Sequence, residues 1–124
     1  MTYLYVIAGA AAGAPLRYFA ASHVQGWTNW TFPTGTMFVN LTGCLLIGFI
    51  ATLAEEREVI NREARLLLVA GFLGSYTTFS AFGYETLELL RENLVLRALL
   101  NVGLSTSVGV LAAWAGMALA RAGT

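Results

Sequence analysis

The sequence contains very little charge. Only 11% of its 124 residues are charged, and all of these are arginine or glutamate, because lysine and aspartate are absent. A soluble domain carries about 25% charged residues, so this chain has too few to coat a water-soluble globule of its size. Its net charge of zero leaves no electrostatic footprint for a nucleic acid. We therefore expect no nucleic-acid partner.

Cysteine and histidine are also scarce, with one of each. Cys44 has no second thiol for an internal disulfide, and it cannot belong to a cluster of several thiolate ligands. We expect it to be a small packing residue. His23 is predicted to lie in a loop, where it is solvated or at the membrane surface. The usual catalytic acids, bases and metal ligands are missing from the apolar segments, so the sequence predicts that the protein is not an enzyme.

Hydrophobic residues make up 57% of the chain, and the charges between them are clustered. Seven of the 14 lie within residues 55–65, five lie within 85–97, and only Arg17 and Arg121 lie elsewhere. The runs between the clusters are long enough for membrane helices, which need roughly 20 apolar residues. They do not alternate in polarity as the strands of a membrane barrel do.

We therefore predict an all-α, multi-pass protein of the cell membrane. It is a single domain over residues 1–124 with transmembrane helices at about 3–21, 34–54, 66–84 and 98–120. Arg17 falls near the end of the first span, from where its side chain can reach the interface. The first segment lacks a basic start, so no cleaved signal is expected. Trp27 and Trp30 suit the aromatic belt of a membrane interface.

Small residues recur at four-residue spacing in two spans. Gly9 and Gly13 form a GxxxG pattern, and Ala112, Gly116 and Ala120 form a similar stripe. Such surfaces let membrane helices pack closely. They predict helix contacts and carry no chemistry.

The arginines give almost no preference for one orientation in the membrane. With four spans, both termini and the 55–65 connection share one side. That side holds four arginines and the other holds three, counting Arg17. Either a feature outside this count sets the orientation, or the chain inserts both ways up. In the second case two opposite copies pair around an axis in the membrane plane.

The polar residues inside the spans are neutral. No carboxylate lies at mid-membrane, which argues against a proton-coupled exporter. Thr36, Asn40 and Gly43 share one face of the second span, and Asn101 and Ser105 are four residues apart in the fourth. A buried asparagine must find a partner. Asn40 therefore either joins helices together or lines a polar path, and both interpretations stay open.

The third span has the least helical composition. Residues 71–82 include two glycines, two adjacent threonines and two serines, which weaken a helix. We predict that this helix is broken at mid-membrane, where its free carbonyls need partners or an ion. Phe79 and Phe82 share a face if the helix resumes. They either pack and meet lipid, or turn their positive ring edges toward an anion.

Four blocks of the sequence resemble the Fluc (CrcB) family of fluoride channels, in family order and across all four spans. They are GAAAGAPLRY from Gly9, GTMFVNLTG from Gly35, GFLGSYTTFSAF from Gly71 and NVGLS from Asn101. The third block is the most specific. Ala10, Ser75 and Ala81 depart from the family pattern, and Ala81 removes a hydroxyl near the pore.

The resemblance implies a passive channel that exports fluoride across the plasma membrane and lowers its cytoplasmic concentration. It implies an antiparallel, dual-topology homodimer in the lipid bilayer, with two fluoride pores. The anion pore residues would be Asn40, Phe79, Ser80, Phe82 and Ser105. A structural Na⁺ at the dimer centre would be held by the backbone carbonyls of Gly74 and Thr77. The alternative from another class is a non-transporting assembly subunit.

Overall fold

The computed structural model of the chain describes residues 1–29 and 31–123, and every regular element in these ranges is helical. The elements are α1 (Thr2–Thr28), α2 (Thr34–Glu56), α3 (Arg62–Arg65), the π-helix η1 (Leu66–Leu73), α4 (Gly74–Tyr76), α5 (Phe79–Arg91) and α6 (Val95–Ala122). Within the described ranges, four segments are long and apolar enough to cross a membrane: Thr2–Thr28, Thr34–Glu56, Arg62–Arg91 and Val95–Ala122. The predicted all-α architecture with four spans is confirmed.

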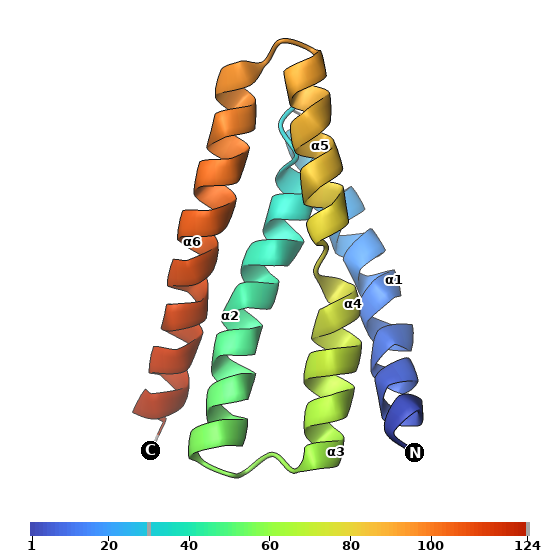
Figure 1. Cartoon of the computed structure of the whole chain (residues 1–124), viewed down its shortest axis with the longest axis vertical. Helices are drawn as coiled ribbons and strands as arrows, with labels where there is room; N and C mark the ends of the chain where they lie inside the picture. The colour runs from blue at the N-terminus through green and yellow to red at the C-terminus, as the bar shows by residue number, and fades with distance from the viewer. Residues whose placement is uncertain (30, 124) are drawn as a thin grey trace.

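The four long segments run up and down beside one another (Figure 1). Both termini and the connection from α2 to α3 lie at one end, and the other two connections lie at the opposite end. Helix α2 packs mainly against α6, and α1 packs mainly against η1. The third segment, from α3 to α5, therefore has α1 along its first half.

The small residues bring these helix pairs close together. A Cβ atom added to Gly9 would meet the Leu67 carbonyl oxygen and the Phe72 amide nitrogen across the α1–η1 contact. A Cβ atom on Gly116 would meet the Leu45 carbonyl oxygen across the α2–α6 contact. Backbones can approach this closely only where side chains are missing. The helix contacts predicted from both stripes are confirmed.

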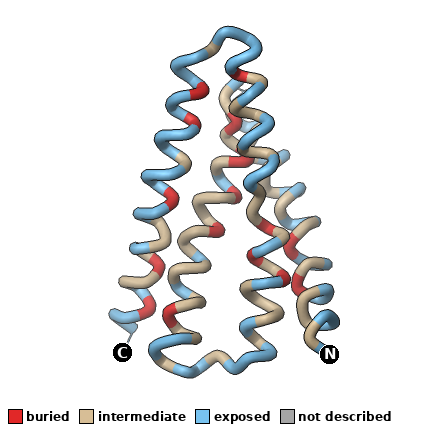
Figure 2. Tube along the Cα trace, viewed as in Figure 1, coloured by how far each residue is buried: buried red, intermediate tan, exposed pale blue. Residues whose placement is uncertain are grey.

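The buried core is small, since few positions along the trace are buried (Figure 2), and many large apolar side chains are exposed. Val39, Leu73 and Tyr76 form the central buried cluster. Leucines on the outer face of α6 are exposed, Leu96 to 71% and Leu99 to 63%. An exposed apolar surface of this extent suits a lipid surrounding rather than water.

The first helix is longer than predicted. The connection expected at 22–33 is helical as far as Thr28, because polar residues at a membrane interface do not stop a helix. The helix ends at Asn29, which is left-handed (φ 50°) and whose N–H bonds the Gln25 carbonyl at 2.9 Å. His23 is therefore an exposed helical residue and not a loop residue, with Nδ1 2.8 Å from the Phe19 carbonyl oxygen.

Of the two tryptophans predicted for an aromatic belt at this end, the structure describes Trp27. Trp27 lies in the last turn of α1 with 79% of its surface exposed. Trp30 lies outside the described residues.

Candidate functional site: the interruption of the third segment

Two extended residues interrupt the third segment close to its middle. Helix α4 ends at Tyr76, and α5 begins at Phe79. Between them, Thr77 (φ −95°, ψ 158°) and Thr78 (φ −148°, ψ 116°) have extended backbones. Thr77 closes the first half, because its N–H and its hydroxyl both donate to the Leu73 carbonyl oxygen, at 3.1 and 3.0 Å. Thr78 opens the second half as an N-cap, accepting from the Ala81 N–H at 3.1 Å.

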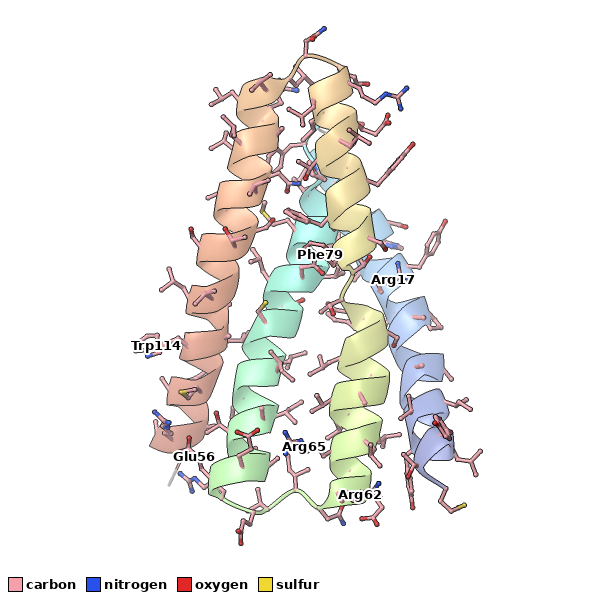
Figure 3. The ribbon with its side chains drawn as sticks, in the orientation of Figure 1. Arg17, Glu56, Arg62, Arg65, Phe79 and Trp114 are labelled. Atoms are coloured by element: carbon pink, nitrogen blue, oxygen red, sulfur yellow. The ribbon has the colours of Figure 1, made fainter. Side chains whose placement is uncertain are left out.

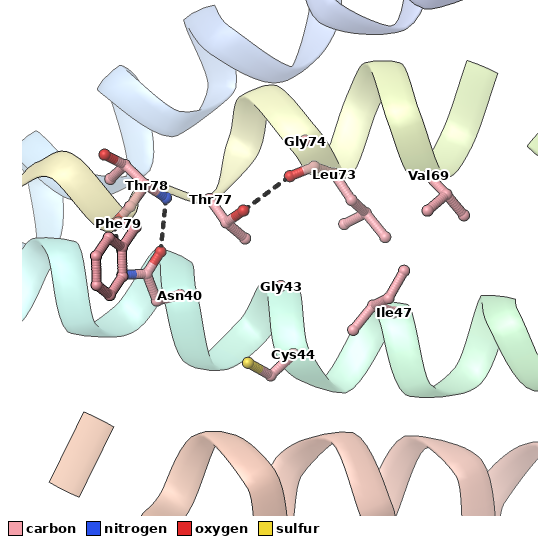
Figure 4. A pocket seen from close by; sticks show the side chains of 10 residues that line it. All are labelled: Asn40, Gly43, Cys44, Ile47, Val69, Leu73, Gly74, Thr77, Thr78 and Phe79. Carbon is pink, nitrogen blue, oxygen red and sulfur yellow. Dashed lines mark hydrogen bonds between the residues drawn. The ribbon is translucent and has the colours of Figure 1, made fainter. Parts of the chain in front are cut away.

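Asn40 of α2 spans the interruption with its side-chain amide (Figure 4). Its Oδ1 accepts from the Thr78 N–H at 2.8 Å, and its Nδ2 donates to the Thr78 carbonyl oxygen at 3.0 Å. The amide thus replaces two hydrogen bonds that a continuous helix would have made. The need for a partner predicted for Asn40 is met by the backbone of the broken segment.

Arg17 of α1 contacts helix α4, directly before the interruption. Its Nε donates to the Ser75 carbonyl oxygen at 3.0 Å. This carbonyl lies in the last turn before the break, where helical acceptors lose their partners. The sequence placed Arg17 near the end of the first span, reaching to the interface. Because α1 continues to Thr28, it instead lies within the helix, at the height of Phe79 (Figure 3).

The two phenylalanines that follow the interruption are in contact. Their ring centroids are 5.7 Å apart and the planes are tilted by 40°. Phe79 is 83% exposed, whereas Phe82 is partly buried. Ser80, between them, is exposed, and its hydroxyl lies 3.3 Å from that of Thr78.

Ser105 lies on α6 and belongs to a separate polar chain that joins α6 to α5. Its hydroxyl lies 3.4 Å from Asn101 Oδ1, and Asn101 Nδ2 donates to the Thr86 hydroxyl at 2.9 Å. Thr86 in turn donates to the Phe82 carbonyl oxygen at 2.7 Å. Sequence reasoning missed Thr86, because it lies in a charged helix end and its partner is 15 residues away.

Two pockets flank the interruption, and both are lined by Gly74, Thr77 and Thr78. The pocket on the α2 side has a volume of about 440 Å³ and is also lined by Asn40 and Phe79. The pocket on the α1 side has a volume of about 610 Å³. It is also lined by Ala14, Arg17, Ser75, Ser80, Ala81 and Tyr84. Two of the sequence-predicted pore residues are thus in the first pocket and one is in the second. Phe82 and Ser105 line neither of these two.

The same segment offers main-chain oxygens for a cation. The carbonyls of Gly74 and Thr77 accept no hydrogen bond from any residue that the structure describes. In the described part of the chain, no three His, Cys, Asp or Glu side chains come together as a metal-binding group. The possible metal ligands at the interruption are neutral, hard carbonyl oxygens, which suit a hard cation of low charge.

The chain is similar to known proteins over most of its length. The model of the family described as CrcB-like protein, Camphor Resistance (CrcB), matches residues 4–117. A Flavobacterium psychrophilum protein is 36% identical over 97% of both chains. A Solibacter usitatus protein is 42% identical over 98% of this chain and 99% of its own length. A Methylococcus capsulatus protein is 44% identical over 95% of this chain and 52% of its own length, so this chain spans about half of that relative.

All three relatives carry the name fluoride-specific ion channel FluC. These are names of ion channels and not of enzymes, in agreement with the prediction from the sequence. Together with the four apolar helices, they identify a multi-pass membrane protein.

Proposed function

Because the chain belongs to the CrcB-like family, we propose that it is a fluoride channel that lets fluoride leave the cytoplasm passively across the plasma membrane. The observation that carries this proposal is the similarity over nearly the full length of relatives named fluoride-specific ion channels. Passive export would lower the concentration of fluoride in the cytoplasm. The proposal requires a path for a small, strongly hydrated anion through four apolar helices.

Neutral hydrogen-bond donors are the first requirement of such a path. Fluoride gives up its water only where donors replace it, and conduction also needs binding that is easily undone. The Asn40 amide has two N–H bonds and uses one of them for Thr78. The other can donate to an anion in the 440 Å³ pocket, where Asn40 is a lining residue. The hydroxyls of Ser80 and Ser105 would supply further donors along the path.

The aromatic edges are the second component. Phe79 and Phe82 directly follow the extended residues, and the exposed ring of Phe79 lines the same pocket as Asn40. An aromatic ring is positive at its edge, so it can face an anion without holding it as tightly as a full charge does. Arg17 places a full positive charge beside the interruption. Its Nε is engaged by the Ser75 carbonyl.

The proposed assembly is an antiparallel, dual-topology homodimer. The helix bounds put four arginines near the end with the termini and two, Arg91 and Arg97, near the other, which is a small excess but a larger one than four against three. Arg17 no longer counts for either end, because it lies within α1. A second copy against the third segment would cover part of the exposed apolar surface.

A sodium ion at the dimer centre would be structural in this proposal. The residues present fit it: the carbonyls of Gly74 and Thr77 are free of hydrogen bonds among the described residues. Two copies would bring four such oxygens together. The ion would supply positive charge to otherwise unpaired carbonyls, each of which would cost several kcal/mol in lipid.

The direct test is fluoride efflux from liposomes that contain the purified protein, followed with a fluoride electrode. We expect rapid efflux of fluoride and little efflux of chloride under the same gradient. Protein-free liposomes give the background. The competing candidate is a non-transporting assembly subunit, which the internal bonds of Asn40 to Thr78 favour. Efflux at the background rate would establish that candidate instead.

A further inference from the structure

A short series of partly buried hydrogen bonds joins α6 to α5 away from the interruption. At its centre is Asn101, which is 2% exposed and is one of the two largest fully buried side chains in the described ranges. It contacts Ser105 on its own helix and Thr86 on α5. These contacts link a residue of the proposed path, Ser105, to the backbone of another, Phe82.

The donor and acceptor of each of these three hydrogen bonds follow from the Phe82 carbonyl, at one end of the series. The Phe82 carbonyl can only accept, so the Thr86 hydroxyl donates its single hydrogen there, at 2.7 Å. The Thr86 oxygen can then only accept from Asn101, at 2.9 Å, which requires that Nδ2 faces Thr86. Asn101 Oδ1 therefore faces Ser105, and the Ser105 hydroxyl is the donor, at 3.4 Å.

The two ends of the series differ in strength. The bonds from Asn101 to Thr86 and from Thr86 to Phe82 have short distances, whereas 3.4 Å is long for a hydroxyl donor. The hydrogen bond from Ser105 to Asn101 is thus weak. An anion that approached Ser105 could replace Asn101 as the acceptor of this hydrogen bond at small cost. When the anion leaves, the Ser105 hydroxyl would donate to Asn101 again. Conduction needs binding of this reversible kind.

We propose that Asn101 is a positioning residue of the anion path. It provides the resting acceptor for the Ser105 hydroxyl, and through Thr86 it fixes the backbone turn that carries Phe82. This inference rests on the proposed fluoride channel function and assigns roles to Asn101 and Thr86, which do not themselves touch the anion.

The test compares matched variants in the liposome efflux assay, over a range of fluoride concentrations. Thr86→Val keeps the shape of the side chain and removes its hydroxyl, and Asn101→Leu removes both polar contacts. We expect each to reduce the initial rate of fluoride efflux about tenfold, as for the loss of one or two partly buried hydrogen bonds. Thr86→Ser restores the hydroxyl and is expected to retain most of the rate.

Thr106→Val is the control on the same helix. Among the residues that the structure describes, the Thr106 hydroxyl bonds only carbonyls of its own helix, Val102 at 2.8 Å and Gly103 at 3.3 Å. Its loss should leave the rate unchanged. The double variant Thr86→Val with Asn101→Leu should transport no more slowly than Asn101→Leu alone, because both changes break the same series. Size-exclusion chromatography of each variant verifies that the protein is assembled.

Three results would overturn the proposal. Thr86→Val could transport fluoride as fast as Thr106→Val, Thr86→Ser could fail to restore the rate, or the two single losses could simply add in the double variant. If Asn101→Leu does not fold, the comparison of Val and Ser at position 86 decides. Wild-type protein with background efflux would instead overturn the proposed function itself, and this inference with it.

Discussion

Phe82 is the residue at which the packing and the anion-path interpretations differ most clearly. Phe82→Ile keeps an apolar side chain of similar bulk and removes the positive ring edge. We expect fluoride efflux to fall about tenfold, since an aromatic contact contributes up to about 1.5 kcal/mol, while size-exclusion chromatography shows an unchanged assembly. Phe19→Ile is the control, because Phe19 is 58% exposed on α1. Unchanged efflux in both Phe79→Ile and Phe82→Ile would return the pair to packing.

We expect the side chain of Arg17 to stabilise the backbone next to the interruption. Its bond to the Ser75 carbonyl is charge-assisted and half-buried. We expect Arg17→Gln to lower the free energy of unfolding in detergent by about 1–2 kcal/mol, and Arg17→Lys by less, since an ammonium group can still donate. Tryptophan fluorescence during denaturation measures both. Arg97→Gln, an exposed position on α6, serves as the control. Equal stability of Arg17→Gln and Arg97→Gln would contradict the role.

At the scale of elements, the contact between α1 and η1 depends on the absence of a side chain at Gly9. A leucine there would meet main-chain atoms of Leu67 and Phe72, which cannot move aside as a flexible side chain can. We expect Gly9→Leu to destabilise the protein by about 3 kcal/mol or more. A Cβ atom added to Gly26 in the same helix meets nothing within 4 Å, so Gly26→Leu should be close to neutral. Thermal unfolding of the two proteins in detergent makes the comparison, and similar midpoints would refute this account.

The elements show what the sequence could predict and what it could not. The spans follow from the length of the uncharged runs, which is a local property. The end of α1 was placed too early because the stop signal is the left-handed Asn29 and not the polar residues before it. The π-helix η1 was not predicted, and its residues lie where the α1 backbone approaches at Gly9. Such an approach depends on two distant segments and leaves no pattern in either.

Some features of the candidate site could likewise be predicted from the sequence, and others could not. The composition of residues 71–82 identifies a weak helix, and the extended residues Thr77 and Thr78 lie within it. The need of Asn40 for a partner could also be read from the sequence. Its partner, Thr78, could not, because it lies 38 residues away. Thr86 had no local signal at all.

At the scale of the whole molecule, the orientation in the membrane is open to direct measurement. Four arginines at one end against two at the other is a small difference, so we expect reporters fused to the C-terminus to appear on both sides. Adding two or three lysines there should bias insertion toward one orientation. It should also lower fluoride efflux when that variant is expressed alone, because opposite copies become rare. Wild-type protein found in a single orientation would count against an antiparallel dimer.

The proposed sodium site makes Gly74 a test of the dimer rather than of the single chain. Gly74 has an ordinary right-handed backbone (φ −61°, ψ −31°), and a Cβ atom there would meet only the Val69 carbonyl oxygen, at 3.6 Å. Within one protomer, alanine therefore fits. If two copies of the Gly74 and Thr77 carbonyls meet around Na⁺, a side chain at position 74 would stand between them.

We therefore expect Gly74→Val to keep its helical circular dichroism and to lose the stabilisation of the dimer by sodium. A bound ion stabilises the state that binds it in proportion to the logarithm of its concentration, so dimer dissociation in detergent is measured with Na⁺ and with N-methylglucamine. Gly83→Val, at a position where an added Cβ atom meets nothing within 4 Å, is the matched control. Thr77→Ser should keep the sodium effect, because the proposed ligand is a backbone atom. A wild-type dimer indifferent to sodium, or a Gly74→Val dimer as sensitive as wild type, would show that these carbonyls hold no cation.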